Sequence, residues 1–222
     1  MWRICSPAMA AIQSSKILDL LDKLHSKGTA IFGADSHGFT LNDVLAEDAV
    51  LAFEQHHGVR LPDDYRQFLL HVGNGGAGPF YGVFPLGFVD DNFDLRAWQE
   101  NDNLVGSLSE SFVFDQAWNA LSSMPEPDLL NRDESEYGRQ QESFERIYWN
   151  SSLVNGAIPI CHEGCAIRVL LVVRGSQAGK LWEDRRSEYE GLRPLMLKNG
   201  SPATFSEWYS EWLRSCMTAA EI

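Results

Sequence analysis

The run Cys161-His162-Glu163-Gly164-Cys165 holds the side chains with the greatest chemical potential in this sequence. Thiols, an imidazole and a carboxylate this close together could bind a metal ion or serve a hydrolase. A structural zinc ion needs four ligands, normally from two separate knuckles, and the other cysteines, Cys5 and Cys216, lie near the chain ends without ligand-like neighbours. The pattern therefore favours a strand end with small buried residues. A metalloprotein or hydrolase that uses Cys161, His162 and Cys165 stays open as an alternative.

Two glycine-rich segments look like phosphate-binding loops. Residues 73–78, Gly-Asn-Gly-Gly-Ala-Gly, fit the letters of the dinucleotide motif, but that motif must follow a strand and open a helix. Here a predicted helix comes first, so the loop would meet the negative end of the helix dipole, which repels phosphate. Residues 175–181 place Leu181 where a phosphate loop needs Ser or Thr. Both segments are therefore predicted to be turns, and no cofactor is expected.

Other ionisable pairs lack catalytic spacing. His56 and His57 are adjacent on a predicted helix and so point to different faces. Asp63-Asp64 and Asp90-Asp91 are likewise adjacent, and neither G-x-S-x-G nor H-E-x-x-H occurs. We therefore expect no enzyme and assign no catalytic, cofactor-binding or metal-binding residue.

Negative charge is the most distinctive chemical property. The 222 residues carry a formal net charge of −13, and residues 90–150 hold fourteen acidic and four basic side chains, a local balance of −10. Such charge opposes binding to nucleic acid or anionic membranes and favours a basic protein partner. Electrostatic attraction can raise the association rate with such a partner by about ten- to a thousandfold. The alternative is a solvated surface or mobile insertion. The candidate protein-binding residues are Asp90, Asp91, Asp94, Glu126, Asp128, Asp133, Glu134 and Glu136.

Helices are predicted on both sides of this acidic stretch. Residues 47–57 have acidic side chains in their first turn and Gly58 just beyond the last. A helix that begins near Pro62 has an apolar stripe of Tyr65, Phe68, Leu69 and Val72. Thr204 and Glu207 form a capping-box pattern before a final helix rich in aromatic residues. Further helices are expected at residues 14–24, 95–98, 117–121 and 135–149.

Strands are predicted mainly in the last third of the chain. Residues 166–173 are nearly all apolar, which indicates a strand buried on both faces. The loop at 175–179 should turn the chain back into residues 180–183. Shorter strands are expected at 30–39, 81–84 and 157–161. Because the order lacks a βαβ rhythm, we expect an α+β fold with a central, mostly antiparallel sheet flanked by helices.

The bulk properties indicate a cytoplasmic protein. The chain has no apolar run of about 18 residues, which a membrane span would need. Its start lacks the pattern of a secretory signal, and its cysteines are too sparse for a disulfide scaffold. Neither a membrane nor a nucleic acid is expected as a partner.

Residues 61–70, Leu-Pro-Asp-Asp-Tyr-Arg-Gln-Phe-Leu-Leu, continue into 72–79, Val-Gly-Asn-Gly-Gly-Ala-Gly-Pro, and Tyr81-Gly82. This helix start, Phe-Leu pair and G-N-G-G turn closely resemble the SUKH superfamily, which contains bacterial immunity proteins and fungal regulators of cell-wall synthesis. The resemblance extends to Ile158-Pro159-Ile160, Leu181-Trp182 and the final helix. It implies one SUKH-like domain over residues 1–222, with an acidic, family-variable expansion at about 88–156.

The resemblance also implies a function. A SUKH-like protein would neutralise a cognate toxin of a polymorphic or contact-dependent system, so the partner would be a toxin protein with a basic surface. The fungal relatives imply an alternative, a regulatory or scaffolding module for protein interactions. The resemblance carries over no catalytic residue and specifies neither the toxin nor the oligomeric state.

Overall fold

A computed structural model of the chain describes residues 7–28, 30–91 and 94–222. The α-helices are α1 (Pro7–Lys27), α2 (Ala34–His37), α3 (Glu47–His57), α4 (Asp63–His71), α5 (Pro127–Arg132), α6 (Glu134–Tyr148) and α7 (Phe205–Ala220). The 3-10 helices are η1 (Leu121–Ser123), η2 (Ser151–Val154) and η3 (Arg186–Glu188). The strands are β1 (Phe88–Asp91), β2 (Asp94–Ala97), β3 (Ala157–Gly164), β4 (Ile167–Val172), β5 (Leu181–Arg185) and β6 (Gly191–Pro194).

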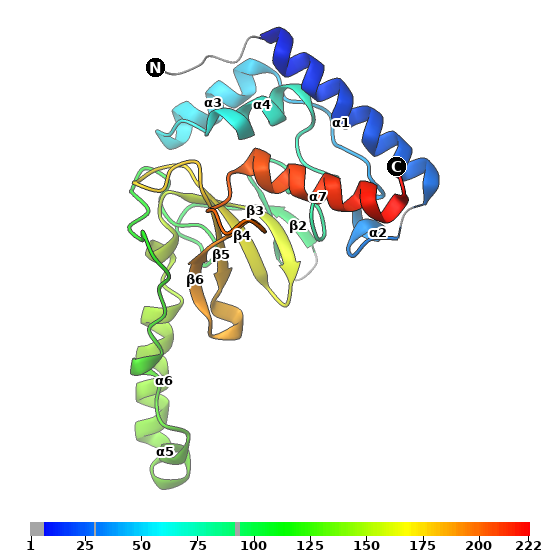
Figure 1. The fold of residues 1–222 in the computed structure, drawn as a ribbon. Coiled ribbons are helices and arrows are strands. Elements are labelled where there is room, and N and C mark those ends of the chain that lie inside the picture. The colour runs from blue at the N-terminus through cyan, green and yellow to red at the C-terminus, as the bar shows by residue number, and fades with distance from the viewer. Residues whose placement is uncertain (1–6, 29, 92–93) are drawn as a thin grey trace.

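The central sheet is an antiparallel meander in which β3, β4, β5 and β6 follow one another in sequence and in space. A separate antiparallel hairpin, β1–β2, contacts β3 at one edge. Figure 1 shows α7 lying across the sheet with α1, α3 and α4 beyond it, whereas α5 and α6 extend away from the sheet. This arrangement confirms the α+β fold, with a mostly antiparallel sheet flanked by helices, that the sequence predicts.

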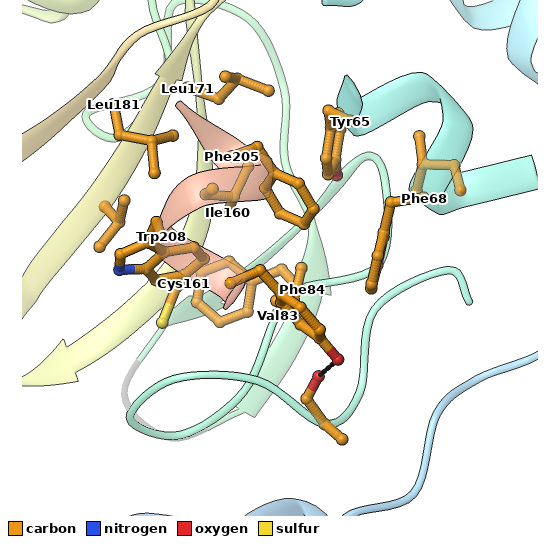
Figure 2. Packing of buried hydrophobic residues seen from close by; sticks show 14 of the residues in the cluster. Tyr65, Phe68, Val83, Phe84, Ile160, Cys161, Leu171, Leu181, Phe205 and Trp208 are labelled. Atoms are coloured by element: carbon orange, nitrogen blue, oxygen red, sulfur yellow. Dashed lines mark hydrogen bonds between the residues drawn. The ribbon is translucent and has the colours of Figure 1, made fainter. Parts of the chain in front are cut away.

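Helix α7 joins α4 to the sheet through aromatic packing. Its predicted capping box is present, because the side chains of Thr204 and Glu207 each accept a hydrogen bond from the other residue's backbone N–H. The Phe205 ring lies 4.9 Å from the rings of both Tyr65 and Phe68. Figure 2 shows these rings packed with buried side chains of the sheet. Each such aromatic side chain stabilises the fold by about 2–3 kcal/mol, so this cluster holds α7 firmly in place.

The glycine-rich segment 73–78 is a turn that packs against neighbouring backbone. Gly76 has a φ of 96°, and a Cβ on it would lie 2.5 Å from the Thr40 carbonyl oxygen. The Tyr209 hydroxyl of α7 donates a hydrogen bond of 2.9 Å to the Ala77 carbonyl. Since α4 precedes this turn, the predicted order of helix and then turn is confirmed.

The opposite face of the sheet is covered by the segment that leads into the arm of α5 and α6. The Phe112 ring lies 4.8 Å from the ring of Trp182 in β5. Trp118 pairs with Leu192 of β6 through two backbone hydrogen bonds of 2.8 and 2.9 Å. Every residue of β4 except Arg168 is buried, which confirms the prediction of a strand covered on both faces.

Several predictions for short segments are wrong. Residues 30–39 contain helix α2 in place of a strand. Residues 81–84 form isolated bridges through Val83 and no regular strand, because Gly82 has a φ of 98°. Residues 95–97 belong to β2, and 117–120 form no helix where Trp118 pairs with Leu192 of β6, although helices are predicted at 95–98 and 117–121; Leu121 begins η1. In these last two cases pairing with another segment of the chain outweighs local helix propensity.

Candidate functional site

The predicted acidic residues gather mainly on a helical arm, residues 126–150, which comprises α5, α6 and their connections. Figure 1 shows this arm projecting from the sheet, with α5 at its far end. Glu136 is half-buried and forms an ion pair with the exposed Arg139. The helical arm carries five of the eight candidates, of which all but Glu136 are exposed: Glu126, Asp128, Asp133, Glu134 and Glu136.

Asp133 joins the two helices of the arm. Its backbone N–H donates to the Leu129 carbonyl at 2.8 Å, and its Oδ1 accepts from the Glu136 N–H at 2.9 Å. Glu134 and Glu136 lie in the first turn of α6, where the helix dipole favours negative charge. The acidic residues therefore stabilise the helical arm as well as charging its surface.

A buried ion pair anchors the base of the helical arm. Arg186 is 1% exposed, and its Nε and Nη2 donate to the two carboxylate oxygens of Asp184 at 2.8 and 2.6 Å. Its Nη1 donates to the carbonyls of Tyr148 and Asn150 at 3.3 and 3.4 Å. The guanidinium also lies 5.5 Å from the centre of the Trp149 ring. A cation at the negative end of the α6 dipole thus fixes the point where α6 leaves the sheet.

Aromatic packing supports the same base. The Tyr148 ring stacks on those of Phe144 and Trp118, with centres 4.9 and 5.6 Å apart. Phe144 and Tyr148 are the buried residues of α6, so its contact with the body is confined to its last two turns. Leu130 and Ile147 are 48% and 49% exposed. Farther out, the helical arm therefore presents carboxylates and scattered apolar side chains to solvent.

Replacing Gly138 by Ala should stiffen the helical arm. Gly138 is exposed inside α6, and a Cβ on it would meet nothing within 4 Å. Gly destabilises an exposed helix interior by about 0.5–1 kcal/mol relative to Ala, so amides of α6 should exchange about two- to fivefold more slowly. Hydrogen exchange followed by mass spectrometry measures this effect. The amides of β4 in the same variant serve as the reference and should be unaffected, and unchanged exchange in α6 of Gly138→Ala would contradict an ordered α6.

The other three candidates are on the β1–β2 hairpin: Asp90, Asp91 and Asp94. This hairpin lies at the β3 edge of the sheet, whereas Trp118, which stacks on the helical arm, pairs with β6 at the opposite edge. Asp94 is exposed, and the side chain of Asp91 lies outside the part of the chain that the structure describes. The fold therefore separates residues that the sequence places in one acidic stretch.

The cysteine and histidine run is divided between buried and exposed positions. The buried Cys161 thiol donates to the Pro79 carbonyl at 3.3 Å. Burial raises its pKa well above the usual value, which leaves a protonated thiol and a poor nucleophile. Cys165 is exposed, and His162 contacts Asp90, with Nδ1 and Oδ2 separated by 3.0 Å. Among the residues that the structure describes, no three His, Cys, Asp or Glu side chains form a metal-ligand group.

These features define an acidic α+β protein with a projecting helical arm that carries a local charge balance of −4. Residues 45–190 match the SMI1 / KNR4 family (SUKH-1). The chain belongs to this family, which confirms the resemblance seen in its sequence, and the matched range runs from α3 through the helical arm to β5. Comparisons with curated proteins and with solved structures gave no match. Within 7–28, 30–91 and 94–222, the helices are too short or too polar to span a bilayer.

Proposed function

We propose that this protein is an immunity protein, which binds and neutralises a cognate toxin domain of a polymorphic or contact-dependent toxin system. Membership of the SUKH-1 family supports an immunity-type or SMI1/KNR4-like role in general. The observation that supports toxin binding is the helical arm, which exposes carboxylates while the Arg186–Asp184 ion pair holds its base. The protein would act in the cytoplasm as one domain, by occupying a surface of the toxin and without catalysing a reaction.

The chemistry of the helical arm suits a basic groove, such as a nucleic-acid-degrading toxin would use for its substrate. Residues 126–150 contain seven acidic and three basic side chains. Exposed charges of one sign raise the rate of encounter with an oppositely charged partner, and salt screens the effect. Since the base of the arm is fixed before binding, less conformational entropy is lost in the complex.

Neutralising three exposed carboxylates of the helical arm should slow toxin association by about tenfold at low salt. The triple variant Glu126→Gln/Asp128→Asn/Glu134→Gln leaves the Asp133 cap and the Arg186–Asp184 ion pair intact. Surface plasmon resonance with the toxin domain encoded by the neighbouring gene measures the association rate. Co-expression with that toxin measures protection of the cell.

A matched control separates the helical arm from overall charge. Asp19→Asn/Asp22→Asn/Asp43→Asn changes the net charge equally at exposed positions outside the arm. This control should alter the rate much less than the arm variant, and equal slowing would show that the arm is not the steering surface. If the wild-type chain neither binds the neighbouring toxin nor protects cells, it is not an immunity protein for that toxin.

A regulatory or scaffolding module, related to cell-wall synthesis regulators, is the second candidate. It is supported by the matched family, which is described by its SMI1 / KNR4 members. A chain with no toxin gene beside it, which copurifies reproducibly with cell-wall synthesis proteins, would favour this function over immunity.

A further inference from the structure

A second site-like feature lies at the β3 edge of the sheet, away from the helical arm. A cavity of about 560 Å³ opens between α2, the glycine turn and the β1–β2 hairpin. This volume is ample for one long side chain. Its lining includes Asp90, His162, Tyr81 and Leu95, and we refer to it as the Asp90 cavity.

Hydrogen bonds fix the charge at the floor of the Asp90 cavity. The Ala166 N–H donates to Nε2 of His162 at 3.1 Å, so the proton of this ring is on Nδ1, which donates to Asp90 Oδ2 at 3.0 Å. This arrangement is a neutral imidazole, and it leaves the Asp90 carboxylate negative. Oδ1 of Asp90 is buried, and among the described residues none donates a hydrogen bond to it. Because this oxygen is shielded from solvent, Asp90 contributes the negative charge of its carboxylate to the cavity.

The remaining polar groups of the lining do not cancel this charge. Nδ1 of His37 accepts a hydrogen bond of 3.0 Å from the Phe39 N–H, and burial lowers the pKa of His37, so this ring is also neutral. Arg168 lies outside the lining, and its Nη2 donates to the backbone carbonyl of Asp90 at 2.8 Å. With both histidines neutral, Asp90 is the one formally charged side chain among the described lining residues. The lining itself thus carries a single negative charge, which favours a cation over an anion.

The rim of the Asp90 cavity is apolar. Tyr81 and Leu95 line it and are 40% and 52% exposed. Phe32, which is 64% exposed, packs against Tyr81 with ring centres 5.4 Å apart. Exposed aromatic and aliphatic groups around a charged floor complement the apolar stem and cationic head of Arg or Lys, and the Tyr81 ring can also contact the cation through its face.

We propose that the Asp90 cavity binds an arginine or lysine side chain of the partner polypeptide, with the cationic head beside the Asp90 carboxylate and the stem against Tyr81 and Leu95. The inference rests on the proposed function, because that function supplies a basic protein partner. It adds a second contact at the β3 edge, opposite the edge where the helical arm packs. A single anchored residue in a preformed pocket is typical of the few side chains that dominate a protein interface.

The test uses the full chain and the blocked tripeptide acetyl-Gly-Arg-Gly-amide, titrated in ¹H–¹⁵N correlation spectra. Saturable shifts are expected at the amides of Tyr81, Asp90 and His162, with affinity in the millimolar range. The same peptide with neutral citrulline in place of Arg should bind about tenfold more weakly or not at all. Asp90→Asn should cause a similar loss, Tyr81→Leu a smaller one, and Glu126→Gln on the helical arm no change.

Each of these measurements can overturn the proposal. Equal binding of the citrulline peptide by the wild-type chain would do so without any variant, as would an Asp90→Asn chain that keeps its spectrum and its affinity. If agmatine, a small free cation, bound tenfold more tightly than the peptide, the cavity would be a site for a small molecule, and the proposal of a partner side chain would be rejected. If the peptide binds at Asp90 but the arm variant binds the toxin as fast as the wild-type chain, the role of the helical arm is rejected and the Asp90 cavity stands. If the arm variant binds the toxin more slowly but the peptide does not bind at Asp90, the Asp90 cavity is rejected and the role of the helical arm stands.

Discussion

Replacing Arg186 by Met should lower the free energy of unfolding by about 3–5 kcal/mol. Met keeps a long side chain but removes the guanidinium that pairs with Asp184, which is 8% exposed. The carboxylate would then be buried without its cation. The carbonyls of Tyr148 and Asn150 would lose a charged donor at the same time. Urea unfolding followed by circular dichroism measures the loss.

Two further variants test this explanation. Arg139→Met breaks an ion pair in which the arginine is 72% exposed, so stability should change by less than about 0.5 kcal/mol. The double variant Arg186→Met/Asp184→Leu should regain most of the loss, because it leaves no unpaired charge inside the protein. If Arg186→Met were no more destabilising than Arg139→Met, water would have to solvate the Asp184 carboxylate, and the ion pair would not anchor the helical arm.

The same variant links the fold to the proposed function. Arg186 holds the carbonyls at the end of α6, so its removal should loosen the base of the helical arm before the sheet unfolds. Faster hydrogen exchange in α6 than in β4 would show this order. Association with a toxin should then slow although every carboxylate of the helical arm is still present.

The long elements could be predicted because each carries its own signals. Acidic residues and Gly58 bound the predicted helix 47–57, which is confirmed as α3, and the Thr204 capping box marks the start of α7. The continuous apolar run of β4 indicates burial on both faces without knowledge of what covers it. Local sequence is sufficient here because dipole, cap and periodicity agree.

The parts that could not be predicted depend on contacts between distant residues. Residues 95–97 are part of a strand because they pair with β1, and Trp118 is extended because it meets Leu192. Arg186 contacts backbone carbonyls 36 and 38 positions away in the sequence. The only sequence signal of its ion pair is Asp184, two positions earlier. The charge pattern of the sequence likewise places Asp90 in one acidic stretch with the helical arm, because position along the chain does not specify which edge of the sheet a residue occupies.

The wild-type protein should lose stability as the pH rises from 4.5 to 7, and Glu163→Gln should remove this loss. Burial, and next the negative charge of Glu183, raise the pKa of Glu163 from its ordinary value of 4.5 to about 7, against the opposing charges of Arg185 and Arg193. Between pH 4.5 and 7 the folded chain therefore binds a proton that the unfolded chain has lost. By linkage, the wild-type protein becomes less stable as the pH rises through this window.

Comparing the wild-type protein with Glu163→Gln at two pH values measures both the size and the sign of this effect. A shift of this magnitude corresponds to about 3 kcal/mol without screening, and water near the end of β3 should reduce the difference to about 1–2 kcal/mol. Urea unfolding at pH 5 and pH 8 should show similar stability for both proteins at the lower pH and a more stable Glu163→Gln variant at the higher. Glu190→Gln should have the opposite sign at pH 8, because hydrogen bonding to Arg185 lowers the pKa of the exposed Glu190. Parallel pH curves for wild type and Glu163→Gln would mean that the Glu163 carboxylate is solvated like any surface glutamate.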